Sequence, residues 1–196
     1  MTSARDADAT QARILDAALA EFAAVGHAGG RVERIARGAG TNVRMIYAYF
    51  GNKSGLFDAT VRTAVERMAA EVPPEPEALA QWAGRLFDYH QADPTALRVS
   101  LWAQLERPEV AAEPMESYLA KTVSVAEGCD GAITAVDLLA IIYAIAQAWT
   151  VTPVGLLSAD GSDPSSPERI ARHRLSVVAA VAAIVDESTG SREGRR

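Results

Sequence analysis

The chain has 196 residues, of which 49% are hydrophobic and 22% charged, a composition that excludes global disorder. Its single cysteine, Cys129, rules out an internal disulfide, and no spacing of Cys and His predicts a metal site. The most apolar stretch, 133–149, contains Asp137 and Gln147 and is too short to cross a bilayer. No basic and then apolar leader opens the sequence, so we expect a soluble cytoplasmic protein with no membrane association.

Charge is distributed unevenly along the chain. The net charge is −6, which by itself disfavours a nucleic-acid binder. Residues 1–57, however, carry seven basic and five acidic side chains, whereas the remaining 139 residues carry twelve basic and twenty acidic ones. The N-terminal part therefore has a balance of +2 and the rest −8, so only the N-terminal part has the electrostatics to approach phosphates.

Apolar residues at three- and four-residue intervals predict amphipathic helices in the first third of the chain. Gly26 is a natural stop for the first of them, and Asn42 and Asn52 are suited to cap the third and the fourth. The four predicted helices span residues 10–25, 32–39, 42–48 and 52–71.

The remainder of the sequence also predicts helices and no convincing strand. Three prolines at 73, 74 and 76 end the fourth helix, and Thr134 with Asp137 forms a predicted capping box. Helices are predicted over 77–91, 93–107, 133–150 and 167–186, with a loop over 158–167. Pro114 weakens the evidence for a helix in 108–127. We therefore predict an all-α protein with a mobile arm at 1–9 and a flexible tail at 188–196.

Three short helices within residues 10–50 are the content of a helix-turn-helix head. The second and third are joined by a tight turn at residues 39–42, in which Gly40 supplies a positive φ angle. In such units the N-terminal residues of the third helix meet base edges in the major groove. Those residues are Thr41, Asn42, Arg44 and Met45, while Val43 and Ile46 can pack back on the first two helices.

Arg44 is the best candidate for a base contact, because a guanidinium matches the O6 and N7 atoms of guanine. Tyr47, Tyr49 and Lys53 follow, and all three can donate hydrogen bonds to phosphates. The amides at the start of the helix after Asn52 offer a further phosphate site. Packing is the alternative role for the aromatic residues, and we expect Tyr49 to serve it in part.

The run Gly40–Leu56, GTNVRMIYAYFGNKSGL, resembles the signature of the TetR (tetracycline-repressor) family: a glycine turn, a short helix ending in Tyr-x-Tyr-Phe, and an Asn-Lys pair. Ile14, Ala17, Ala18, Phe22 and Gly26 match the family's first helix, and Val32, Ile35 and Ala36 its second. The resemblance covers about residues 10–57. It implies that Tyr47 and Lys53 hold the DNA backbone and that Val43, Arg44 and Met45 face bases.

The sequence departs from the family pattern at two places. Gly30 and Arg31 stand where a Ser or Thr usually caps the second helix, which brings Arg31 to the edge of the predicted DNA-binding surface. Gly at a cap costs only tenths of a kcal/mol, so we expect this helix to form. Gly55 is a weak helix former in the first turn of the fourth helix, at a cost of about 1 kcal/mol relative to Ala.

The C-terminal part resembles the family only in layout, which implies a regulatory and dimerisation domain over residues 58–187 and about nine helices in all. In similar proteins the last two helices form a four-helix bundle with a second copy. The helix at 133–150 is apolar nearly all round and needs cover from more than one core face. The interface candidates on the last two long helices are Leu138, Ile142, Ile145, Leu175, Val178, Val181 and Val185.

Five aromatic residues of the C-terminal part are candidates for a ligand pocket, because helical bundles often bind apolar ligands between their helices. Aromatic residues at helical spacing are more often part of the core, so each alone is better explained as structural. Together they predict a small apolar or aromatic effector: Trp82, Tyr89, Trp102, Tyr118 and Trp149.

Nothing in the sequence predicts a cofactor, a catalytic site or a metal site. His27, His90 and His173 have no partner at ligand spacing, and there is no nucleophile or paired-carboxylate motif. The expected function is a homodimeric regulator that reads a palindromic operator and responds to a small molecule, with repression suggested by the family resemblance. The alternatives are a helical binding or adaptor dimer that does not read DNA, and a small all-α enzyme.

Overall fold

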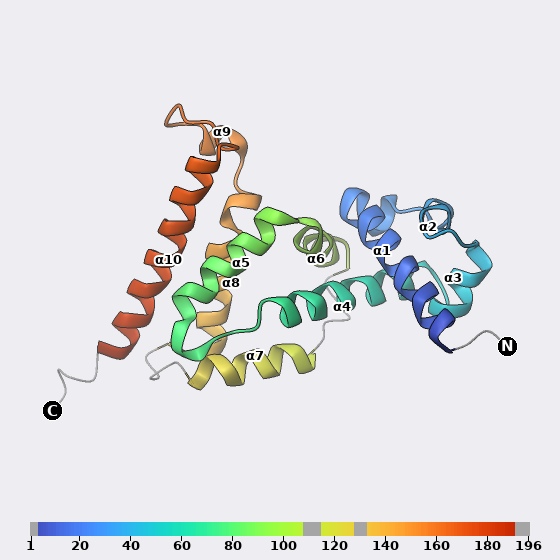
Figure 1. Cartoon of the computed structure of the whole chain (residues 1–196), viewed down its shortest axis with the longest axis horizontal. Coiled ribbons are helices and arrows are strands. Elements are labelled where there is room, and N and C mark those ends of the chain that lie inside the picture. Colours follow the sequence, from blue (N-terminus) through green and yellow to red (C-terminus); the bar gives the residue numbers. More distant parts are fainter. Residues whose placement is uncertain (1–3, 108–114, 128–132, 191–196) are drawn as a thin grey trace. The chain divides into compact units, whose positions relative to one another are not determined.

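The computed structural model of the chain describes residues 4–107, 115–127 and 133–190. These residues form ten α-helices and one 3₁₀ turn and contain no strand, as the sequence predicts (Figure 1). No helix within the described ranges is both long and apolar enough to cross a membrane. The elements are α1 (Ala4–Gly29), α2 (Val32–Gly38), α3 (Val43–Phe50), α4 (Lys53–Glu71), η1 (Pro76–Ala78), α5 (Leu79–Ala92), α6 (Thr95–Glu106), α7 (Met115–Glu127), α8 (Ala135–Val151), α9 (Val154–Leu157) and α10 (Pro167–Gly190).

The helices divide into two compact units, residues 1–68 with 95–114 and residues 69–94 with 115–196. The first unit is larger than the predicted head of residues 10–57, because α6 packs along α1. Its core is the apolar stripe that the sequence predicts for the first helix, closed by residues of α2, α3 and α4. The largest of these side chains are fully buried: Ile14, Phe22, Ile35, Ile46, Leu56 and Phe57.

The end of α1 is shaped by Gly26, which has a φ angle of +71° and interrupts the helix, as the sequence predicts. One further turn follows, to Gly29. A Cβ atom at Gly26 would lie 2.7 Å from Oε1 of Glu106 and 2.9 Å from the ring of Trp102. Glu106 also accepts a hydrogen bond from the amide of Ala28 at 2.9 Å, and Arg98 donates to the carbonyl of Ala23 at 3.1 Å. The side chains of α6 therefore satisfy backbone groups that the break in α1 leaves without helical partners.

The second unit is built around α5, which packs against both α8 and α10, while α7 packs on α8 and η1 (Figure 1). Trp82 is fully buried in α5 and donates its indole N–H to the carbonyl of Val72 at 3.0 Å. Thr134 caps α8 by accepting the amide of Asp137 at 3.1 Å, which confirms the predicted capping box.

Several boundaries differ from the sequence prediction. α1 begins at Ala4, inside the expected arm, and α10 continues to Gly190, inside the expected tail. α7 is described over Met115–Glu127, and Pro114 lies outside the described residues. The short α9 was not expected. Cys129 lies outside the described residues.

Candidate nucleic-acid interface

The turn between α2 and α3 has the predicted geometry. Gly40 has a φ angle of +63°, and Asn42 is extended, with φ −122° and ψ 160°. Its Oδ1 accepts a hydrogen bond from the amide of Met45 at 2.9 Å, so the side chain of Asn42 caps α3. Thr41 is half-buried in the same turn, where its amide donates to the carbonyl of Ala36 at 2.9 Å.

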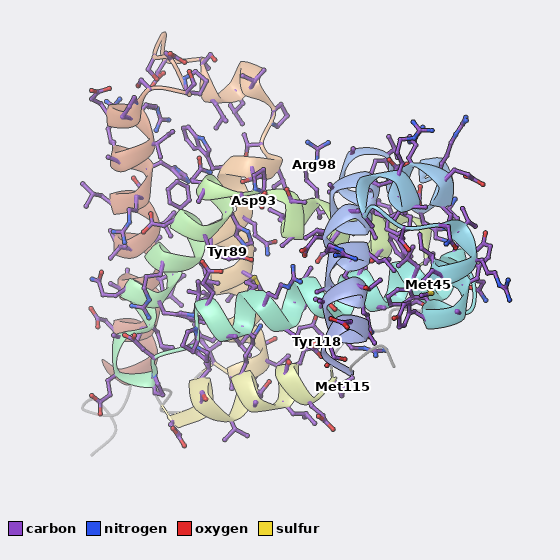
Figure 2. The ribbon with its side chains drawn as sticks, turned by 45° about the vertical axis from the view of Figure 1, so that its right-hand side comes forward. Met45, Tyr89, Asp93, Arg98, Met115 and Tyr118 are labelled. Carbon is purple, nitrogen blue, oxygen red and sulfur yellow. The ribbon has the colours of Figure 1, made fainter. Side chains whose placement is uncertain are left out.

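α3 has one face in the core and one face in solvent. Ile46 is fully buried, and Val43 packs half-buried against the same core, as its spacing predicts. Arg44 is exposed, and Met45 (labelled in Figure 2) and Tyr47 are 41% and 43% exposed. These three side chains form the accessible surface of the helix, whereas Val43 is available only in part.

Two other predicted contacts also have roles within the protein. Tyr49 is half-buried and packs on Phe50, with ring centroids 6.1 Å apart. Lys53 donates from Nζ to the carbonyl of Ala28 at 3.2 Å, which places its ammonium group beside the end of α1. Because an ammonium group has three donor hydrogens, this bond leaves Lys53 able to make another.

The start of α2 is stabilised by a residue that the sequence analysis did not identify. Arg31 is exposed and makes no side-chain cap, but its amide donates to Oε1 of Glu21 at 2.8 Å. The same carboxylate binds the guanidinium of Arg34 at 2.5 Å, and this hydrogen bond lowers the pKa of Glu21. Glu21 thus takes the place of the missing Ser or Thr cap. It lies ten residues before Arg31 in the sequence, whereas capping patterns consider only residues within the first turn of the helix.

The start of α4 explains why Gly55 occupies a helical first turn. A Cβ atom at this position would lie 2.2 Å from the carbonyl oxygen of Phe50, so only glycine fits. Oδ1 of Asn52 accepts the amide of Gly55 at 2.9 Å, as a cap does. Ser54 lies 3.2 Å from Nε2 of His27, whose pKa is lowered by burial and by the nearby charges of Lys53 and Arg107.

Arg107 ties this helix start to α6. Its guanidinium donates to the carbonyl of Ser54 at 3.3 Å and pairs with the carboxylate of Asp58. Both groups of the pair are largely buried. The N-terminal end of α4 is therefore held by side-chain contacts from 49 and 53 residues away in the sequence.

The five aromatic residues predicted for a ligand pocket are divided between the two units. Trp102 belongs to the first unit, where it covers Gly26. In the second unit Trp82 is fully buried, and the ring of Trp149 lies 4.4 Å from that of His173. Tyr89 is half-buried and lies 5.6 Å from the adjacent ring of His90.

Tyr118 lines an apolar hollow of about 360 Å³ between α7 and α8. Lys121 and Tyr143 line the same hollow and were not identified from the sequence. A lysine in a helix is normally expected to be exposed to solvent. The burial of Lys121 depends on packing between helices, so no local sequence pattern predicts it.

The predicted dimer residues divide by burial. Leu138, Ile142 and Val181 are fully buried within the protomer, so they belong to its core rather than to an exposed face. Ile145, Val178 and Val185 are half-buried, and Leu175 is 67% exposed. The exposed surface beside them consists mainly of alanines that the sequence analysis did not single out: Ala140 and Ala144 on α8, and Ala179 and Ala183 on α10.

The histidines do not form a metal site in the described part of the chain, where no three His, Cys, Asp or Glu residues gather as ligands. His90 is buried with no hydrogen-bond partner on either ring nitrogen, and burial lowers its pKa to about 4. It is therefore neutral at physiological pH.

Comparison with known proteins places both parts of the chain in one family. Residues 14–60 match the model of bacterial regulatory proteins of the tetR family, and residues 78–182 match a tetracyclin repressor-like C-terminal domain. The HTH-type transcriptional repressor SCO4008 of Streptomyces coelicolor is 41% identical over 160 residues, which cover 77% of this chain and 83% of that repressor.

Two further relatives agree with this assignment. The crystal structure of SCO4942 from Streptomyces coelicolor superposes with a TM-score of 0.75 at 32% identity, covering 89% of this chain and 97% of that one. The HTH-type transcriptional repressor NicS of Pseudomonas putida is 35% identical over 98 residues, 46% of each chain. The protein is thus a DNA-binding transcription regulator of the TetR family.

Proposed function

We propose that the protein is a homodimeric repressor that reads a palindromic operator in the cytoplasm through α3. The observation that carries this proposal is the two-sided character of α3. Its inner face is held by Ile46 and by the cap of Asn42, while Arg44, Met45 and Tyr47 project from its outer face. SCO4008 and NicS are both described as transcriptional repressors, which favours repression over activation.

Each outer side chain has a distinct role in the proposed complex. Arg44 donates to O6 and N7 of a guanine, so its loss costs about 1–3 kcal/mol and relaxes sequence preference at that position. Tyr47 donates to a phosphate and positions the helix without reading sequence. Lys53 and the amides at the start of α4 bind a neighbouring phosphate, and Thr41, Asn42, Val43, Tyr49 and Arg31 complete the surface at its edges.

The second copy binds through the exposed faces of α8 and α10. Leu175 and the alanines beside it leave an apolar surface on which the helices of another copy can approach closely. Two heads in such a dimer meet half-sites about one helical turn apart, so the operator is an inverted repeat. Ile145, Val178 and Val185 lie half-buried at the margin of that surface.

A small molecule in the second unit releases the operator in this proposal. A ligand that prefers one conformation shifts the protein toward it, and by linkage the ligand and DNA then weaken each other's binding. One structural relative is described as a multidrug binding protein, and another was crystallised with stearoyl-CoA, so small-molecule binding occurs in proteins of this fold.

Selection of duplexes from a random library by the purified full-length protein tests the proposal. We expect an enriched inverted repeat, and we expect Arg44→Ala to lose preference at one position of each half-site. The matched control is Arg62→Ala, which removes an exposed charge from the middle of α4, outside the proposed DNA-binding and dimer surfaces, and should leave the selected sequence unchanged. A folded protein that enriches no sequence at low salt would refute DNA reading.

A further inference from the structure

The hollow between α7 and α8 combines an apolar lining with one buried charge. Its volume of about 360 Å³ lies at the lower end of the range for small-molecule sites. Met115 and Tyr118, labelled in Figure 2, both come from α7, and Met115 at the rim is 60% exposed. Leu119 and Thr122 of α7 and Leu139 of α8 also line the hollow.

Lys121 is the charged group of this hollow and is only 4% exposed. Its Nζ donates to Oη of Tyr143 at 2.8 Å, and it lies 5.8 Å and 5.4 Å from the ring centroids of Tyr118 and Tyr143. Among the described residues no carboxylate forms an ion pair with it. Buried charges are normally paired, so an ammonium group held only by phenol rings is an unusual feature.

The polar groups of the hollow are one ammonium group and neutral hydroxyls, and no carboxylate lines it. An ammonium group has three N–H donors, and Tyr143 receives one of them. Burial raises the pKa of Tyr143, so its hydroxyl stays protonated and can itself donate. The hydroxyl of Thr122 donates to the carbonyl of Tyr118 at 2.8 Å, so it can offer Lys121 only a neutral acceptor. The missing partner is therefore a negative charge, and the best acceptor for a buried ammonium group is an anion.

We propose that this hollow binds a small apolar molecule that ends in a carboxylate. The carboxylate accepts hydrogen bonds from Lys121 and from the hydroxyl of Tyr143, and the apolar part packs against Leu119, Leu139 and Met115. A cationic ligand is disfavoured because it would meet the ammonium group with no lining carboxylate to offset the repulsion. This inference gives the chemical class of the effector and rests on the proposed function only for the effect on DNA.

Calorimetric titration of the full-length protein with three probes of equal chain length tests the inference. Octanoate, octanol and octylammonium differ only in their head groups, so they separate charge recognition from apolar burial. We expect octanoate to bind at least about tenfold more tightly than either other probe, which is the effect of one charge-assisted hydrogen bond. Equal affinity for the three, or no binding of octanoate, would overturn the proposal.

Three variants locate the binding. Lys121→Met removes the charge at similar length and is expected to abolish the preference for octanoate, while Lys121→Arg retains a donor and is expected to keep it in part. Arg62→Met removes an exposed charge of α4 that does not line the hollow and is the control, with no expected change. Circular dichroism confirms folding of each variant, and octanoate binding that survives Lys121→Met would place its site elsewhere.

The effect on DNA is measured separately, with the selected operator and octanoate. If octanoate binds through Lys121 but does not weaken operator binding, the proposed site is supported and release of the operator by the ligand is refuted. If octanoate does not bind at all but other molecules release the operator, the proposed site is refuted and the proposed function is not.

Discussion

Replacement of Lys121 by methionine should stabilise the protein at neutral pH and change its pH dependence. Burial lowers the pKa of Lys121 from 10.5 to about 8. Each pKa unit corresponds to about 1.4 kcal/mol, so holding the charge inside costs the folded state about 3 kcal/mol. The lost hydrogen bond from Lys121 leaves Oη of Tyr143 without its donor, which offsets about 1 kcal/mol. We therefore expect Lys121→Met to gain about 2 kcal/mol at neutral pH.

The sign of the pH dependence follows from the lowered pKa. Below about pH 8 both the folded and the unfolded states carry the proton, so the wild-type protein bears the full cost of burying the charge. Between about pH 8 and 10.5 the unfolded state binds more protons than the folded state, so the stability contributed by this residue rises with pH. The advantage of Lys121→Met should therefore shrink across that interval.

Urea unfolding followed by circular dichroism, at about pH 6 and about pH 10, measures both effects. The titrations of other groups cancel in the difference between variant and wild type. Arg62→Met is the control, because it removes an exposed cation of α4 that does not line the hollow, and its loss should give a small, constant difference. A difference for Lys121→Met that is equal at the two pH values would refute the reasoning.

Three further substitutions test the first unit. Gly26→Ala should destabilise the protein by about 2 kcal/mol or more, because a positive φ is strained and the new Cβ meets Glu106; an unchanged melting temperature would contradict this. Asn42→Ala should cost about 1 kcal/mol in urea unfolding by removing the cap on Met45, whereas Asn42→Gly should cost only tenths. Tyr47→Phe should weaken operator and random DNA equally without changing the salt dependence, because a phenol releases no counterion; a changed slope in binding titrations at several salt concentrations would contradict it.

The features that the sequence predicted correctly are local ones. The apolar stripes predicted the long helices, and Asn42 and Thr134 were recognised as caps because a cap and its amide lie three residues apart. The outer face of α3 followed from the same periodicity, since Ile46 had to point inward. The contiguous signature through Gly55 then identified the family.

The features that only tertiary structure decided depend on residues distant in the chain. Gly26 is predicted from the sequence to stop the helix, but only the packing shows that a Cβ atom there would lie 2.9 Å from the ring of Trp102, 76 positions later. Gly55 is a nearer case: the sequence predicts a weak helix former, whereas in the structure the carbonyl of Phe50, five residues earlier, occupies the space that a side chain would need. The side chain of Lys121 is buried where α7 packs on α8, and its Nζ contacts Tyr143, 22 residues away. Periodicity and caps are set by the geometry of one helix, whereas burial and close approach depend on which helices pack together. The hollow between α7 and α8 is a product of that packing.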